Sequence, residues 1–203
     1  MNILKIKNKY VAVVSFMMLA VTLQAQDYGA LKYMLQKRPA NEKFESNKFN
    51  EHLFFSAGIG PYNLLTSGSS QDGPGMMAHL FMGKWVTPVH GLRLGVNMGY
   101  LPSKIYTSKI KMGGGSLDYM LNMSSLAFGY NEHRHFELLG IAGVETGYSK
   151  VNDNSERADN YPGLKGGSDL YYGVHFGLQG NVRLAPTLDL FVEPRIGWYN
   201  DCL

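Results

Sequence analysis

The stretch from Leu170 to Tyr199 sorts its side chains into two alternating sets, and this pattern restricts the possible folds more than any other feature of the chain. One set is apolar: Tyr172, Val174, Phe176, Leu178, Val182, Leu184, Leu188, Leu190, Val192, Pro194, Ile196 and Trp198. The other set is mostly charged, amide or glycine. Successive side chains of a strand point to opposite faces, so the pattern predicts a β-hairpin with one apolar and one polar face, broken at residues 185–187. Strands of this length suit a tilted crossing of a bilayer better than a soluble sheet.

Five stretches upstream show the same alternation with varying clarity. They are His52–Asn63, Met76–Val86, Leu92–Tyr100, Ser116–Phe128 and Phe136–Tyr148. The connections between the seven predicted strands are alternately long and short, with long loops at 64–75, 102–115 and 149–169. Outer-membrane barrels show this alternation because their long loops lie outside and their tight turns lie in the periplasm. The sequence therefore predicts an all-β, antiparallel, up-and-down transmembrane β-barrel over residues 52–203.

A count of seven strands needs an explanation, because bacterial single-chain barrels close with an even number. An open barrel would leave two edges whose backbone groups lipid cannot satisfy. Either the count is wrong at the weak first strand, or an eighth strand is missing after Tyr199. We expect the second case, a barrel of the eight-stranded type with about seven strands present that lacks its last strand.

The N-terminal residues have the layout of a secretory signal peptide. Three lysines at positions 5, 7 and 9 precede an apolar run from Tyr10 to Leu23, and Ala25 is placed for cleavage. The alternative, a transmembrane helix anchor, needs about 20 apolar residues, and this run is shorter. We therefore predict a signal peptide over 1–25, followed by a polar periplasmic lead-in segment over 26–51.

Charge and cysteine content narrow the function classes. Removal of residues 1–25 takes away three lysines and no acid, which leaves 16 basic and 16 acidic residues. A chain without surplus positive charge is not expected to bind nucleic acid. The single cysteine, Cys202, allows no disulfide within the chain. No cofactor is expected.

Several short motifs resemble OmpA-type outer-membrane barrels. They are Gly83–Pro88 followed by Gly91–Leu94, and Leu117–Met123 leading into Gly129–Glu132. The resemblance extends over about 53–199, and it implies an eight-stranded barrel with little or no pore. Such barrels are often followed by a peptidoglycan-binding domain. No such domain is visible in this sequence, and no peptidoglycan site is expected.

The polar faces of the predicted strands carry both signs of charge. Side chains just fill the interior of an eight-stranded barrel, so these residues are expected to form a salt-bridged plug rather than line a channel. We predict that Arg93, Arg183 and Arg195 pair with four carboxylates, and that His175 lies on the same lumen face. The four carboxylates are Glu137, Glu145, Asp189 and Glu193. The alternative is a solvated outer face of a soluble sheet.

Aromatic residues near the strand ends are predicted to lie at the boundary between lipid and water, where an amphipathic ring is favoured. They are Trp85, Tyr100, Tyr148, Tyr172 and Trp198. The alternative is that they are ordinary core aromatics at the margin of a sheet.

No catalytic or metal-binding motif is recognised. His133 and His135 lie close together but lack a second ligand cluster, and no serine stands in a nucleophile motif. The sequence predicts a non-enzymatic barrel in the outer membrane of a Gram-negative bacterium. Its partners would be outer-membrane lipid, lipopolysaccharide and an unknown ligand of the surface loops. The alternative function is a soluble lipocalin-like barrel that binds an apolar ligand.

Overall fold

The computed structural model describes residues 11–24, 52–65, 73–102, 110–131, 134–151 and 168–200. These residues form an all-β structure with one short helix. The elements are β1 (Val11–Gln24), β2 (Leu53–Leu65), β3 (Gly75–Trp85), β4 (His90–Leu101), β5 (Ile110–Asn122), α2 (Met123–Phe128), β6 (Phe136–Val151), β7 (Ser168–Ala185) and β8 (Leu188–Tyr199). The predicted lead-in segment, Cys202 and most of the three long loops lie outside the described residues.

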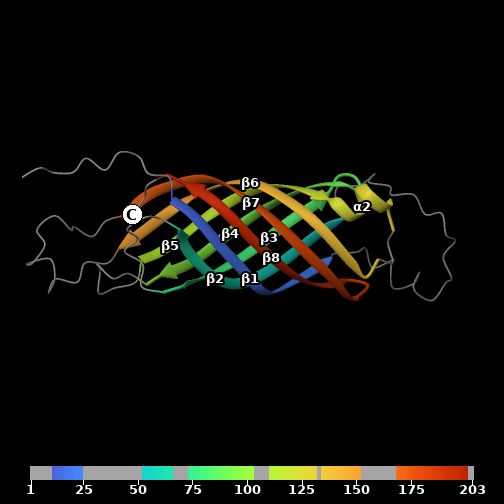
Figure 1. Ribbon diagram of the computed structural model, residues 1–203, viewed down its shortest axis with the longest axis horizontal. Coiled ribbons are helices and arrows are strands. Elements are labelled where there is room, and N and C mark those ends of the chain that lie inside the picture. The colour runs from blue at the N-terminus through green and yellow to red at the C-terminus, as the bar shows by residue number, and fades with distance from the viewer. Residues whose placement is uncertain are drawn as a thin grey trace, which may run out of the picture.

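The strands follow one another around the sheet in chain order, and every pair is antiparallel. Strands β2 to β8 correspond to the seven predicted strands, so the all-β, up-and-down architecture is confirmed. Strand β1 pairs with both β2 and β8 and thereby closes the barrel. Figure 1 shows the strands crossing the long axis obliquely, with α2 at one end and the described end of β8 near the other.

Strand β1 is the element that the sequence analysis did not expect. Its residues fall inside the predicted signal peptide, yet their backbone lies between the first and last predicted strands, with Val11 opposite Tyr199 and Gln24 opposite Phe54. The strand that completes the count is thus the first in chain order, whereas we expected the last to be missing. This pairing does not test export, and the signal peptide stays a prediction.

The boundaries of β5 correct two predictions. The loop predicted over 102–115 is too long, because β5 begins at Ile110 and contains all three glycines of the run 113–115. The strand predicted over 116–128 is also too long, because it ends at Asn122 and residues 123–128 are helical. The Asn122 side chain accepts a hydrogen bond from the Ser125 amide at 2.8 Å and so caps α2. Gly129, with φ 76°, ends the helix.

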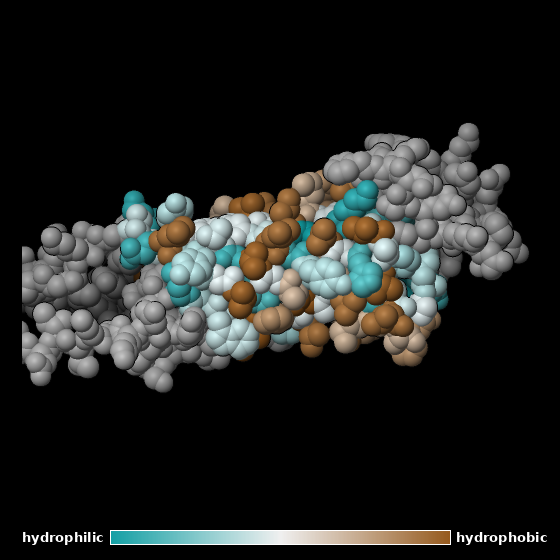
Figure 2. All heavy atoms as spheres, turned by 90° about the horizontal axis from the view of Figure 1, so that it is seen from above, coloured by the Kyte–Doolittle hydropathy of each residue, from teal (hydrophilic) through white to brown (hydrophobic). Residues whose placement is uncertain are grey.

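The alternation of side chains separates inside from outside. On β4, Arg93 and Asn97 are buried, whereas Leu94, Val96 and Met98 are more than half exposed on the outer wall. Figure 2 shows apolar residues scattered over the visible outer face of the barrel. The polar parity of the strands therefore faces the lumen, and the apolar parity faces outward.

The lumen contains apolar side chains toward its ends. Toward the end with the connections 102–110 and 151–168, which we call the loop end, lies a buried cluster of Tyr62, Met77, Leu101, Ile110, Met112, Tyr171 and Tyr199. Toward the opposite end, the turn end, lies a cluster of Phe54, Met120, Leu139 and Ile141. The charged residues predicted for the lumen lie mostly between these two clusters.

Candidate functional site: the charged lumen

Glu193 on β8 is the centre of the lumen network. Its carboxylate is fully buried and accepts two hydrogen bonds from Arg93, at 2.9 Å from Nη1 and 2.8 Å from Nη2. Arg195 donates two more to the Oε1 atom, from Nε at 3.0 Å and from Nη2 at 2.6 Å. The forked Arg93 contact has the bidentate geometry that makes arginine–carboxylate pairs strong. The structure thus brings three of the predicted residues together.

A second buried carboxylate, Asp118 on β5, joins the same network. It accepts a hydrogen bond from Arg93 Nε at 2.6 Å, and its other oxygen lies 2.9 Å from His175 Nε2. Arg195 Nη2 lies 3.9 Å from it. Asp118 is the register partner of Arg93 across β4 and β5. The sequence shows that Asp118 lies on the polar parity, but only the strand register reveals this pairing.

Glu145 has different partners from those predicted. Its carboxylate accepts hydrogen bonds from Asn97 Nδ2 at 2.8 Å, from Tyr171 at 3.0 Å and from Tyr199 at 3.0 Å. The imidazole of His175 lies beside it, with Nδ1 3.8 Å from Glu145 Oε2. Because β6 places Glu145 toward the loop-end tyrosines, it is held by amide and phenol donors rather than by arginine.

The remaining predicted residues lie nearer the turn end. Arg183 and Asp189 are register partners on β7 and β8, and their ion pair is 3.2 Å long and partly exposed. Glu137 on β6 is half-buried. The eight predicted residues therefore divide into a buried central group and a looser group at the barrel end.

Phe81 on β3 is a lumen residue that the charge pattern did not indicate. The guanidinium carbon of Arg93 lies 4.0 Å from its ring centroid, and that of Arg195 lies 5.5 Å away. A cation over an aromatic face is attracted by the electrons of the ring. Gly95 leaves space for this ring, since a Cβ atom there would lie 2.7 Å from it. Phe81 thus packs against both guanidinium groups and against Gly95 of β4.

The hydrogen bond from Tyr199 to Glu145 gives a first prediction. The Tyr199→Phe substitution is expected to lower the free energy of unfolding by about 1.5–3 kcal/mol, because a buried carboxylate loses one donor. Urea unfolding of detergent-refolded protein measures the change. Tyr148→Phe is the matched control, since Tyr148 is 66% exposed on the outer wall and should change stability little. Equal effects of the two substitutions would contradict the proposed hydrogen bond.

The predicted interfacial aromatics do not all lie on one side of the wall. Tyr100, Tyr148, Tyr172 and Trp198 are exposed on the outer wall toward the loop end. Trp85 is on the inward parity of β3, half-buried, and packs against the turn-end cluster with its ring 6.3 Å from that of Phe54. The turn end has other exposed aromatics, Phe128 and Phe136, which the sequence analysis did not select.

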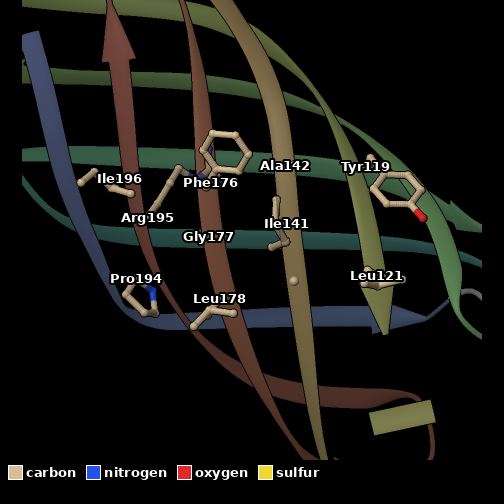
Figure 3. Close-up of a pocket in the computed structure, with 11 residues that line it drawn as sticks. Tyr119, Leu121, Ile141, Ala142, Phe176, Gly177, Leu178, Pro194, Arg195 and Ile196 are labelled. Atoms are coloured by element: carbon tan, nitrogen blue, oxygen red, sulfur yellow. The ribbon is translucent and has the colours of Figure 1, made fainter. Parts of the chain in front are cut away.

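A hollow on the outer wall crosses strands β5 to β8. Its volume is about 540 Å³, and small residues at Gly140, Ala142 and Gly177 form part of its lining between larger side chains such as Tyr119 and Phe176 (Figure 3). The hollow has an almost entirely apolar lining. The hollow continues the apolar outer wall, and the charged residue of its lining, Arg195, directs its guanidinium to Glu193 in the lumen.

Within the described ranges, no group of three or more His, Cys, Asp or Glu side chains is placed to hold a metal ion. The same residues include no helix long and apolar enough to cross a membrane. His133 lies outside the described residues, and His135 is exposed beside β6.

The fold and the lumen together define an antiparallel β-barrel with an apolar outer wall and a buried network of charges inside. No protein-family model and no curated protein matches the chain. The resemblance to OmpA-type barrels therefore rests on the sequence motifs alone.

Proposed function

We propose that this protein is a β-barrel of the outer membrane of a Gram-negative bacterium, with a structural or surface-interaction role and little or no pore. The observation that carries the proposal is that the outer wall of the barrel is apolar on most of its strands. Exposed apolar side chains occur on every strand from β2 to β8, among them Ile59, Leu80, Val96, Leu117, Val144, Val174 and Ile196. Soluble monomers rarely expose apolar patches of more than a few hundred Å². Lipid, including lipopolysaccharide, is the partner that such a wall fits.

The exposed aromatics near the two ends of the barrel support the same proposal. On β6, Phe136 near the turn end and Tyr148 near the loop end are both more than half exposed. They are twelve residues apart, which at about 3.3 Å per residue and a tilt of about 40° corresponds to roughly 30 Å along the barrel axis. This spacing is close to the thickness of the hydrocarbon core of a bilayer.

The contents of the lumen support a role other than conduction. Arg93, Asp118, His175, Glu193 and Arg195 are all buried at its centre. Side chains that pair across an eight-stranded barrel fill it and leave no water-filled channel. The same contents argue against the lipocalin-like alternative, because a cup for an apolar ligand would be lined by apolar side chains. In this proposal the long loops make the contacts with other molecules, and their ligand is unknown.

A charge placed on the outer wall tests the membrane proposal. The Val96→Arg substitution puts a guanidinium in the middle of β4, where the side chain is 57% exposed. If lipid covers this wall, the substitution should lower folding stability in bilayers by about 2–4 kcal/mol. The control is Val86→Arg, since Val86 is 53% exposed but lies in the turn after β3. Urea unfolding from lipid vesicles measures both variants.

The two variants separate membrane and soluble barrels. A soluble barrel tolerates a new surface charge within about 0.5 kcal/mol at either position. Equal and small effects at positions 96 and 86 would therefore contradict the membrane proposal. A large loss at position 96 with little change at position 86 is the expected result.

A further inference from the structure

The hollow on the outer wall of β5 to β8 rises toward the loop end of the barrel. One row of its lining consists of consecutive register partners on the four strands: Tyr119, Ala142, Phe176 and Ile196. Tyr119 lies near the turn end of β5, whereas Ile196 lies beyond the middle of β8, and Figure 3 shows these two residues at opposite sides of the hollow. With strands about 4.8 Å apart and tilted by about 40°, the row rises by roughly 9 Å along the barrel axis.

The hollow has the size and the lining of a binding site for an alkyl chain. Its volume of about 540 Å³ lies within the range of roughly 300–1,000 Å³ that is usual for small-ligand pockets. Its depth comes from Gly140 and Ala142, which have little or no side chain on the outward parity of β6. The Phe176 ring borders it on the loop side and packs edge-on against Trp198, with 6.2 Å between ring centroids. An almost entirely apolar lining offers few hydrogen bonds, so the hollow fits hydrocarbon.

A polar pair lies at the turn side of the hollow. His90 is exposed on the outward parity of β4, and its Nδ1 is hydrogen-bonded to the hydroxyl group of Tyr119, with the two rings 5.9 Å apart. A neutral imidazole and a phenol carry one polar hydrogen each, so their mutual hydrogen bond leaves one donor for another acceptor. Lys84 adds a positive charge on the outward parity of β3, at the register level of Leu92 and Tyr119. An anion with several acceptor oxygens, such as a phosphate, fits this end of the hollow.

We propose that the hollow holds one acyl chain of a glycerophospholipid whose phosphate is bound at the His90–Tyr119 pair. The proposal rests on the proposed function, because it requires that lipid covers the wall and that the turn end faces the periplasm. In this orientation the acyl chains of the inner leaflet point from the turn end toward the loop end, which is the direction in which the hollow rises from Tyr119. Lipopolysaccharide of the outer leaflet would place its phosphates at the loop end, where the hollow ends at the apolar Phe176 and Ile196.

The test of the acyl-chain site is native mass spectrometry of the full refolded chain in octyl glucoside, titrated with dioleoylphosphatidylglycerol. One lipid molecule is expected to bind above the nonspecific background. The Ala142→Phe substitution fills the hollow and should weaken this binding by about tenfold or more. Val144→Phe is the matched control, because Val144 also faces outward on β6 but lies outside the lining, and its affinity should stay within about twofold of the parent.

The test of the phosphate site uses Tyr119→Phe, which keeps the ring in the lining and removes the hydroxyl group. This variant should bind dioleoylphosphatidylglycerol about fivefold more weakly, because the phosphate loses a hydrogen-bonded partner. Its affinity for dioleoylglycerol, which has the same chains and no phosphate, should not change. Tyr148→Phe is the control on the outer wall toward the loop end and should behave as the parent.

The proposal is overturned if Ala142→Phe and Val144→Phe bind alike, if Tyr119→Phe and Tyr148→Phe bind alike, or if dioleoylglycerol binds as tightly as dioleoylphosphatidylglycerol. These outcomes are distinct from failure of the membrane proposal, which the Val96→Arg substitution tests on another strand. A large loss of stability at position 96 without single-site lipid binding would overturn only the phospholipid site. Single-site binding with no loss at position 96 would overturn only the membrane location.

Discussion

The Glu193→Gln substitution is expected to lower the free energy of unfolding by about 3–5 kcal/mol, the largest effect of any single isosteric change in the lumen. Glu193 accepts hydrogen bonds from both Arg93 and Arg195, and all three side chains are buried. Glutamine keeps the size of the side chain but removes its negative charge. Two guanidinium groups then share the carboxylate of Asp118. Urea titration of the refolded protein, followed by tryptophan fluorescence, measures the loss.

Asp189→Asn is the matched control for this prediction. Asp189 is also a carboxylate on β8 that pairs with an arginine, but the side chain of its partner Arg183 is 20% exposed. Asp189 is itself buried, but Arg183 reaches water whereas Arg93 and Arg195 do not, so this variant should lose clearly less stability than Glu193→Gln. If the two substitutions cost the same, Glu193 is not the centre of a buried network.

The Gly143→Ala substitution is expected to cost about 2–4 kcal/mol, because it adds a methyl group where the lumen has no space. A Cβ atom at this position would collide with Asp118 Oδ1 and would lie 2.7 Å from His175 Nε2. These two atoms are hydrogen-bonded to each other, and both side chains are fully buried. Neither can withdraw without breaking the bond to the other. Urea unfolding of the detergent-refolded variant checks the prediction.

Gly140→Ala tests whether the effect belongs to the lumen. Gly140 lies on the same strand but on the outer wall, where a Cβ atom would be at an ordinary contact distance of 3.6 Å from Met123. Alanine there should be neutral or slightly stabilising, since it reduces the conformational freedom of the unfolded chain. A larger loss at position 140 than at position 143 would show that the lumen is less tightly filled than the structure indicates.

The fold follows largely from the period-two pattern, because a strand with one apolar face can bury or cover that face in few ways. The hairpin of β7 and β8 was predicted almost to the residue, with β8 beginning at Leu188. The pattern fails where glycines remove it. Gly113 to Gly115 have no side chains to alternate, so they resemble a loop although the backbone pairs with β6.

The lumen was predictable in composition but not in pairing. Parity alone places Arg93, Glu193 and Arg195 on one face, and these three do meet. Parity does not give the register in which neighbouring strands pair. That register decides that Asp118 faces Arg93 and that Glu145 lies near Tyr199. The position of β1 in the barrel also could not be predicted from the alternation, because its sequence is apolar on both parities.

The most direct test of the membrane account is the environment of the outer wall of β4. Spin labels at positions 94, 96 and 98, introduced one at a time into a Cys202→Ser background, report collisions with oxygen and with a water-soluble nickel complex in lipid vesicles. If lipid covers this wall, oxygen access is high and nickel access low at all three positions, with the largest difference at position 96, and nickel access is high at the control position 86. Nickel access at position 96 equal to that at position 86 would show that water, not lipid, covers this wall.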